Sequence, residues 1–213
     1  MKNKAAILLI ILSCAVLASC RDRFGNELNE YYLSGHTFLI PDKYLGVYPE
    51  NSVTDYLELS VKMPGFQARM PHNKSSFEKG DKITIQIWPA TGKLLNETNN
   101  EYLKSSFNIK LGSKIYRWDN PKQLDNGLIY IRATKGTGWL SDYYLQKDNE
   151  KYIFLLECFT ELEGHSPPVP LCRSDTLILK DLKLTYWYPQ KYLPQAQEIH
   201  KSIIDLILNF EKL

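Results

Sequence analysis

Side chains suited to catalysis or metal binding are sparse in this sequence and lie far apart. The four histidines, His36, His72, His165 and His200, have no His-Glu-x-x-His or Cys-x-x-Cys spacing around them, so nothing local supports a zinc site. There is no Gly-x-Ser-x-Gly nucleophile motif, and residues 135–139 (Lys-Gly-Thr-Gly-Trp) lack the length and the Lys-Ser/Thr ending of a phosphate loop. We therefore expect a protein that is not an enzyme and holds no cofactor or metal.

The first two cysteines, Cys14 and Cys20, lie within and directly after an N-terminal leader. Residues 1–19 have a cationic start, an apolar centre and a small-residue end, which is typical of a signal peptide. Residues 17–20 (Leu-Ala-Ser-Cys) resemble the lipobox of bacterial lipoproteins. The resemblance implies that the Cys20 thiol receives diacylglycerol and becomes the new N-terminus, and that Arg21 after it favours the outer membrane. The alternative is a plain signal peptide with a chance cysteine.

The leader sets the expected organisation of the chain. A lipid on Cys20 would anchor the protein to the membrane, since several acyl chains bind firmly. Residues 20–30 are mostly polar and predict a flexible tether. Residues 31–213 are long enough for a single globular domain, which we expect to face the periplasm.

The formal charge surplus also lies in the leader. The chain has 26 Lys and Arg against 24 Asp and Glu, and both Lys2 and Lys4 precede the first acidic residue, Asp22. Without these two lysines the numbers of basic and acidic residues are equal. A charge-balanced domain excludes a broadly basic nucleic-acid binder, because neutralising phosphates requires a net cationic face. We therefore expect no nucleic-acid partner.

Two cysteines remain for the folded domain, Cys158 and Cys172. Residues 152–159 are rich in strand formers, residues 164–170 are a Pro-rich loop, and a second strand-like run follows. A chain reversal near His165 would place the two cysteines opposite each other, so an oxidising periplasm predicts a disulfide between them. A metal-binding or catalytic pair is the alternative, but no Cys-x-x-Cys or His-Cys cluster supports it.

The hydrophobic pattern predicts an α+β fold, mainly an antiparallel β-sheet with a C-terminal amphipathic helix packed on it. The segments typical of strands are 37–40, 57–63, 83–88, 128–133, 143–146, 151–159, 176–179 and 182–188. Apolar residues then recur at steps of three and four, which predicts a helix over 195–212. Segment 90–126 is not assigned, and 114–118 is its best strand candidate.

Aromatic residues are numerous, with 14 Tyr, 4 Trp and 8 Phe, and several stand next to each other beside strands and turns. They serve either the core or a protein interface. Since alternate side chains of a strand point to opposite faces, one member of an adjacent pair should point outward. The candidate partner-binding residues combine aromatics with polar residues nearby: Trp139, Tyr143, Tyr144, Glu161, Glu163, His165 and Trp187.

Residues 158–210 contain a cysteine-ended strand, a Pro-rich loop ending at Cys172, a strand ending in Tyr-Trp-Tyr and a helix. This order resembles the immunity lipoproteins found beside secreted antibacterial effectors, notably phospholipase effectors of type VI secretion. The resemblance implies a periplasm-facing protein that binds a toxin and occludes it. Two other functions stay open: a structural or assembly lipoprotein of the outer membrane and, with least support, a cell-envelope enzyme.

Overall fold

The computed structural model describes residues 27–47, 49–63, 65–68, 81–112, 117–135, 139–162 and 170–212. Its strands are β1 (Leu28–Leu33), β2 (His36–Pro41), β3 (Leu45–Val47), β4 (Leu57–Lys62), β5 (Gln67–Ala68), β6 (Lys82–Pro89), β7 (Arg117–Trp118), β8 (Lys122–Gln123), β9 (Ile129–Lys135), β10 (Trp139–Asp148), β11 (Lys151–Leu162), β12 (Leu171–Ile178) and β13 (Leu182–Pro189). Its α-helices are α2 (Asn99–Leu111) and α3 (Ala196–Phe210), and short 3-10 helices cover Asp42–Tyr44, Gly92–Asn96 and Gln190–Gln195.

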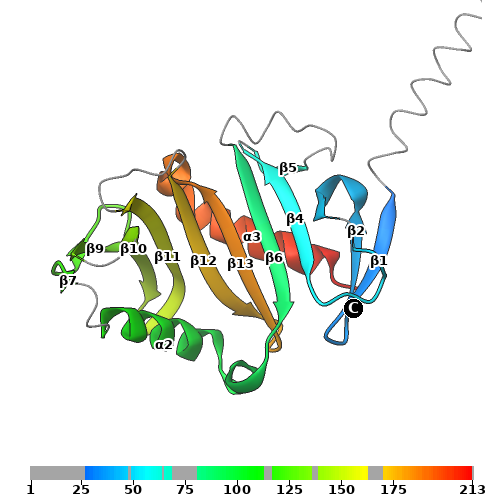
Figure 1. The fold of residues 1–213 in the computed structure, drawn as a ribbon, viewed down its shortest axis with the longest axis horizontal. Coiled ribbons are helices and arrows are strands. Elements are labelled where there is room, and N and C mark those ends of the chain that lie inside the picture. Colours follow the sequence, from blue (N-terminus) through cyan, green and yellow to red (C-terminus); the bar gives the residue numbers. More distant parts are fainter. Residues whose placement is uncertain are drawn as a thin grey trace, which may run out of the picture.

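Most strands join one sheet. Within the described residues its order is β3–β4–β6–β13–β12–β11–β10–β9–β7, with β5 paired to β4 and β8 to β9, while β1 and β2 form a separate hairpin (Figure 1). All these strand pairs are antiparallel. The predicted fold class is therefore confirmed, and every predicted strand segment overlaps a strand. Of the candidate strand at 114–118, the structure describes the last two residues, which form β7.

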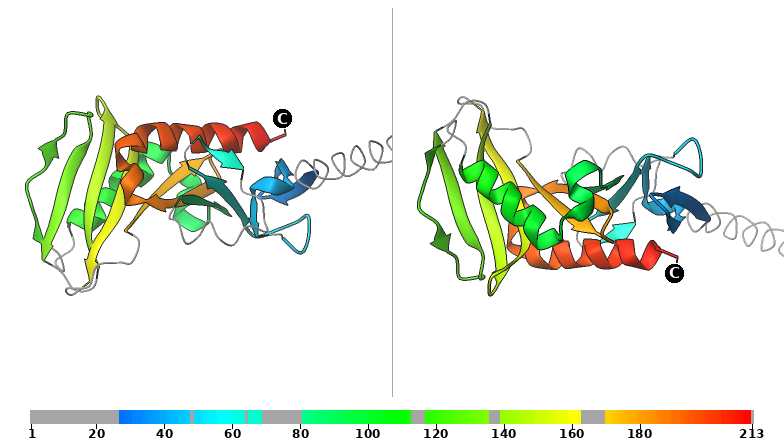
Figure 2. Two further views of the ribbon diagram at one scale, coloured as in Figure 1. Left: turned by 90° about the horizontal axis from the view of Figure 1, so that it is seen from above. Right: turned by 90° about the horizontal axis from the view of Figure 1, so that it is seen from below.

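The C-terminal helix packs on one face of the sheet, as its periodicity predicted. Its buried side chains are Ala196, Ile199, Ile203 and Ile207. They join the core formed by the apolar sides of the central strands, and Figure 2 shows α3 running along one side of the sheet. The helix ends at Phe210, earlier than predicted, because Glu211 leaves the helix and forms a β-bridge with Phe38 of β2.

Helix α2 lies in the segment left unassigned and covers part of the other face. Leu103 and Phe107 pack against the apolar side chains of β9, β10 and β11 that point away from α3. The helix begins after a capping box, a reciprocal pair of side-chain to backbone hydrogen bonds. The Thr98 N–H donates to Glu101 Oε2 at 2.8 Å, and the Glu101 N–H donates to Thr98 Oγ1 at 3.3 Å.

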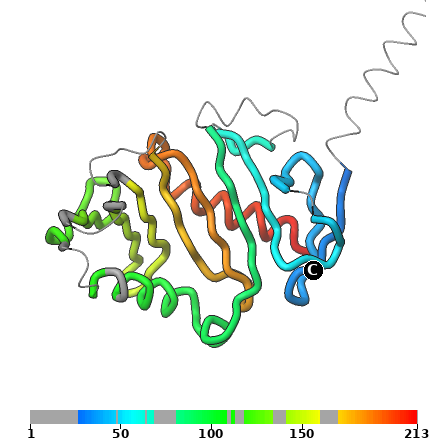
Figure 3. The backbone as a smooth tube through the Cα atoms, in the orientation of Figure 1, coloured from blue at the N-terminus to red at the C-terminus, as the bar shows by residue number. Residues whose placement is uncertain are grey.

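The hairpin of β1 and β2 lies beside the C-terminal end of α3 (Figure 3). Phe38 is fully buried in the core, and the Lys212 N–H donates to the Thr37 carbonyl at 2.8 Å. Because β1 begins at Leu28, the last three residues of the predicted tether, 20–30, belong to this strand.

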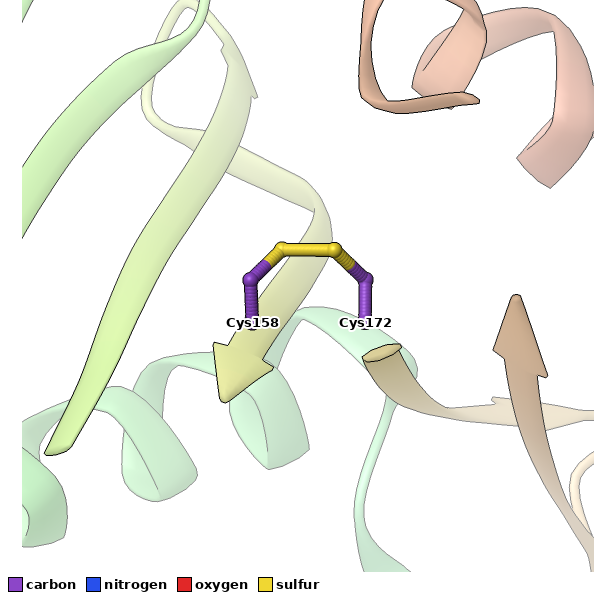
Figure 4. Close-up of a disulfide and its surroundings, with 2 residues drawn as sticks. All are labelled: Cys158 and Cys172. Carbon is purple, nitrogen blue, oxygen red and sulfur yellow. A yellow bond between two sulfur atoms is a disulfide. The ribbon is translucent and has the colours of Figure 1, made fainter. Parts of the chain in front are cut away.

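The two halves of the sheet meet at β11 and β12. Their ladder has three residue pairs, Leu156 with Ser174, Glu157 with Arg173, and Cys158 with Cys172. The two cysteines form a disulfide with their Cα atoms 4.0 Å apart (Figure 4), which confirms the predicted bridge. Within the described residues the strand order crosses from one half of the sheet to the other through this ladder alone, so the disulfide links the halves.

Beyond the ladder, the start of α2 supplies hydrogen-bond acceptors to both strands. The Leu177 N–H of β12 donates to Asn99 Oδ1 at 2.9 Å, and the Tyr152 N–H of β11 donates to Asn100 Oδ1 at 2.8 Å. These two asparagines therefore satisfy backbone groups that a neighbouring strand would otherwise pair.

Candidate partner-binding face

One face of the central strands has no helix over β4, β6 and β13 in the part of the chain that the structure describes (Figure 1). Because side chains alternate along a strand, the apolar residues of these strands point to α3 and the others point to the opposite side. We call that opposite surface the open face. With the neighbouring β12 included, its residues are Glu58, Ser60, Lys62, Lys82, Thr84, Gln86, Trp88, Arg173, Asp175, Lys183, Thr185 and Trp187, of which Ser60 and Thr185 are buried.

A network around Asp175 on β12 lies on the side of the open face that borders α2. Its Oδ2 lies 2.9 Å from Arg173 Nη2, and its Oδ1 accepts a hydrogen bond from Thr185 at 2.5 Å and lies 3.5 Å from Lys183 Nζ. The Arg173 guanidinium is 5.7 Å from the ring centre of Trp187, where a cation–π interaction is favourable. Arg173 is therefore held in place by two neighbours before any partner binds.

A second tryptophan stands at the end of β6. The ring of Trp88 stacks on Tyr56, with 4.6 Å between ring centres and 14° between planes, and the residue is 37% exposed. Trp88 lies opposite Lys183 in the register of β6 and β13. The open face therefore presents two tryptophans that are fixed by neighbours and still accessible.

The side of the open face on β4 and β6 is polar. Gln86 Nε2 donates to Glu58 Oε2 at 2.8 Å across the two strands. Lys62 and Lys82 lie directly opposite each other in the register. This part of the face supplies hydrogen-bonding groups and positive charge without an apolar patch.

A small pocket of 70 Å³ lies where the open face meets α2. Its walls are Tyr102, Leu103, Ser106, Leu155, Glu157, Arg173 and Asp175. Burial, together with the charge of Asp175, raises the pKa of Tyr102 to about 12, so its phenol stays protonated. Because pockets that hold small-molecule ligands have about 300 Å³ or more, this one is a polar recess of the surface and not a substrate cavity.

The predicted binding residues fall in different places. Trp187 lies on the open face. Tyr143 and Tyr144 do alternate between faces, but a helix covers each face here, and the two are only 5% and 8% exposed. Tyr143 packs in the α2 core and donates a hydrogen bond to Glu157 at 2.5 Å, whereas Tyr144 packs in the α3 core. Burial therefore favours the core role over the interface role for this pair.

The other predicted residues are not placed on the open face. Trp139 and Glu161 lie on the paired ends of β10 and β11. Glu163, His165 and the lipidation residue Cys20 lie outside the described residues. Their roles stay predictions.

Sequence reasoning did not select Trp88, Arg173, Asp175 and Lys183. Trp88 and Lys183 stand in the strands predicted at 83–88 and 182–188, whereas Arg173 and Asp175 precede the predicted segment 176–179, because β12 begins earlier, at Leu171. Alternation directs all four away from the side that α3 covers. The available signal was a tryptophan or a charged residue at a polar position of an alternating strand. This pattern does not distinguish a binding surface from an ordinary solvated surface.

The two histidines that the structure describes serve the fold. Burial lowers the pKa of His200 to about 4, and its Nδ1 forms a hydrogen bond of 2.8 Å with the Tyr186 hydroxyl. His36 of β2 lies 2.7 Å from Asp181 and 2.6 Å from Glu211. The described residues contain no cluster of three His, Cys, Asp or Glu side chains suited to a metal, and none of the described helices is long and apolar enough to span a membrane.

Comparisons with known proteins give a likeness in fold. No family model and no curated protein matches the sequence. The structure is similar to Smlt3025, an immunity protein of the Stenotrophomonas maltophilia type IV secretion system, with a TM-score of 0.58 and 13% sequence identity. The alignment covers 89% of this chain and 95% of that chain. The antiparallel sheet with its C-terminal helix is thus a fold that a secretion-system immunity protein also has.

Proposed function

We propose that this protein is an immunity lipoprotein that binds a secreted antibacterial toxin and neutralises it. The observation that carries the proposal is the likeness in fold to an immunity protein along nearly the full length of both chains. The open face supports it, because a rigid sheet surface with fixed Trp and Arg side chains has the composition of strong protein-binding sites. Inhibition would be by occlusion, which requires tight binding and no chemistry.

The lipid on Cys20 would keep this domain at the membrane. Only about seven residues separate Cys20 from β1, so even a fully extended tether spans at most about 25 Å. The domain would meet a toxin close to the bilayer of the outer membrane, on its periplasmic side. Because residues 158–210 resemble immunity proteins of phospholipase effectors, a toxin that attacks phospholipids is the first partner to test.

The test is protection of a susceptible bacterium. Cells that express the toxin gene adjacent to this gene in their periplasm should survive when they also carry this protein, and the toxin should co-purify with it. A Cys20→Ser variant should leave the membrane fraction while its domain stays folded. If cells with and without the protein die equally, the proposal fails. A general envelope defect on deletion, without any protection, would indicate the assembly lipoprotein instead.

A further inference from the structure

The open face differs in charge from the opposite side of the molecule. It carries four cations, Lys62, Lys82, Arg173 and Lys183, against two carboxylates, Glu58 and Asp175. The exposed charged residues of α3 are Glu198, Lys201 and Asp205, with one net negative charge. Among the residues that the structure describes, the open face is therefore more basic than α3, and it is also the face on which no described helix lies over β4, β6 and β13.

Two lysines stand side by side at one end of the face. Lys62 and Lys82 stand directly opposite each other on β4 and β6, and like charges in this position destabilise a strand pair. Asp81, next to β6, feels the charge of Lys62, and its pKa is lowered chiefly by its hydrogen bonds to Lys191 and Tyr192. Carboxylates of a bound partner would meet two neighbouring positive charges at this end of the face.

We infer that the open face binds an acidic surface of the toxin, with Trp187 and Arg173 at the centre of the contact and Lys62 and Lys82 at its rim. This inference rests on the proposed function. Tryptophan and arginine are the residue types that carry most binding energy when they lie centrally, and rim charges chiefly speed association. A complementary partner therefore carries a cluster of Asp and Glu facing the lysines.

Nucleic acid fits the face less well than an acidic protein. An excess of two cations is small for a phosphate-binding surface, because each neutralised phosphate requires its own contact. Glu58 and Asp175 also lie within the face, where they would repel a phosphate backbone. Their carboxylates instead can accept hydrogen bonds from side chains of a protein partner.

The test uses the full-length protein in detergent micelles and the purified toxin from the adjacent gene, with association and dissociation followed by biolayer interferometry. Lys62→Glu should slow association at least about three-fold at about 50 mM salt, with a smaller effect at about 500 mM. The same change creates an opposite-charge pair with Lys82, so the melting temperature of the variant should not fall below that of the wild type. Lys201→Glu on α3 is the matched control and should bind like wild type.

Trp187→Ala should raise the dissociation constant for the toxin at least about 30-fold, as expected at a binding hot spot. If the wild type protects cells but Lys62→Glu and Trp187→Ala bind the toxin as tightly as Lys201→Glu, the open face is not the binding surface and the immunity function survives. If the wild type neither binds nor protects, the proposed function itself fails. Tight binding of a duplex DNA oligomer in place of the toxin would overturn the choice of an acidic protein.

Discussion

The disulfide gives the most direct test of how the two halves of the sheet are held together. Cys158 and Cys172 are separated by 14 residues in sequence and are fully buried. Closing a loop of about 15 residues lowers the entropy of the unfolded chain by an amount worth about 3 kcal/mol. A Cys158→Ala/Cys172→Ala double variant should therefore lose about 3 kcal/mol of unfolding free energy, and the lost packing of two buried sulfurs adds to this.

The assay is urea unfolding followed by tryptophan fluorescence, with the reduced wild type measured beside the double variant. The reduced wild type should lose about 3 kcal/mol because it lacks the cross-link, and the double variant should lose somewhat more because it also lacks the two buried sulfurs. Ser174→Ala is the matched control, since it removes the hydrogen bond from Ser174 Oγ to the Leu155 carbonyl, 2.9 Å across the same ladder, and should cost only about 1 kcal/mol. A double variant within about 1 kcal/mol of wild type would refute the entropic argument.

Three further predictions rest on single side chains. Asn99→Ala should lower the free energy of urea unfolding by about 1–3 kcal/mol because the buried Leu177 N–H loses its acceptor. Asn99→Asp keeps an oxygen at this position and should lose clearly less. Equal losses would contradict the role of Asn99 as the acceptor. Burial lowers the pKa of His200 to about 4, so its contribution to stability is present above pH 6.5 and should fall toward pH 4 by up to about 1.4 kcal/mol per pH unit. His200→Gln should flatten the measured curve in that window, and an unchanged slope would show that other groups cause it. Burial lowers the pKa of His36, but hydrogen bonds to Asp181 and Glu211 outweigh it and raise the pKa overall, so the stability it supplies should be complete below pH 6.5 and decline as the pH rises through the folded-state pKa. A His36→Gln variant that keeps this decline in urea titrations at rising pH would disprove the assignment.

The fold was predictable where the hydrophobic period is clear. The strands at 57–63 and 83–88 and the helix at 195–212 each have one apolar side, and burial of that side explains them. Helix α2 lacks such a signal, since mainly Leu103 and Phe107 of its 13 residues face the core. The capping box formed by Thr98 and Glu101 was the local sign of its start, and a capping box alone does not predict that a helix continues.

The site was only partly predictable because exposure depends on which strands a helix covers. Tyr143 and Tyr144 alternate as a strand requires, yet α2 and α3 bury both. Trp187 has the same local pattern, an aromatic beside aromatics, but lies where α2 does not reach. Strand alternation predicts which side of the sheet a residue faces, but tertiary packing determines whether that side is exposed to solvent.

The dimensions of the elements explain why an open face exists. Helix α2 has 13 residues and is about 20 Å long, whereas the nine strands in line span roughly 38 Å, so one such helix covers at most about half of a sheet face. Segments 143–145 and 153–156 are continuously apolar, as expected for strands covered on both faces. Strands β4, β6 and β13 alternate instead, as expected for strands with one solvent-facing side.

On the solvent-facing side, alternation requires polar residues, and Trp88 and Trp187 depart from this pattern. Residues that break a local rule without serving the core tend to mark function. That argument is independent of charge, and it selects the same residue, Trp187, at which alanine should most reduce toxin binding.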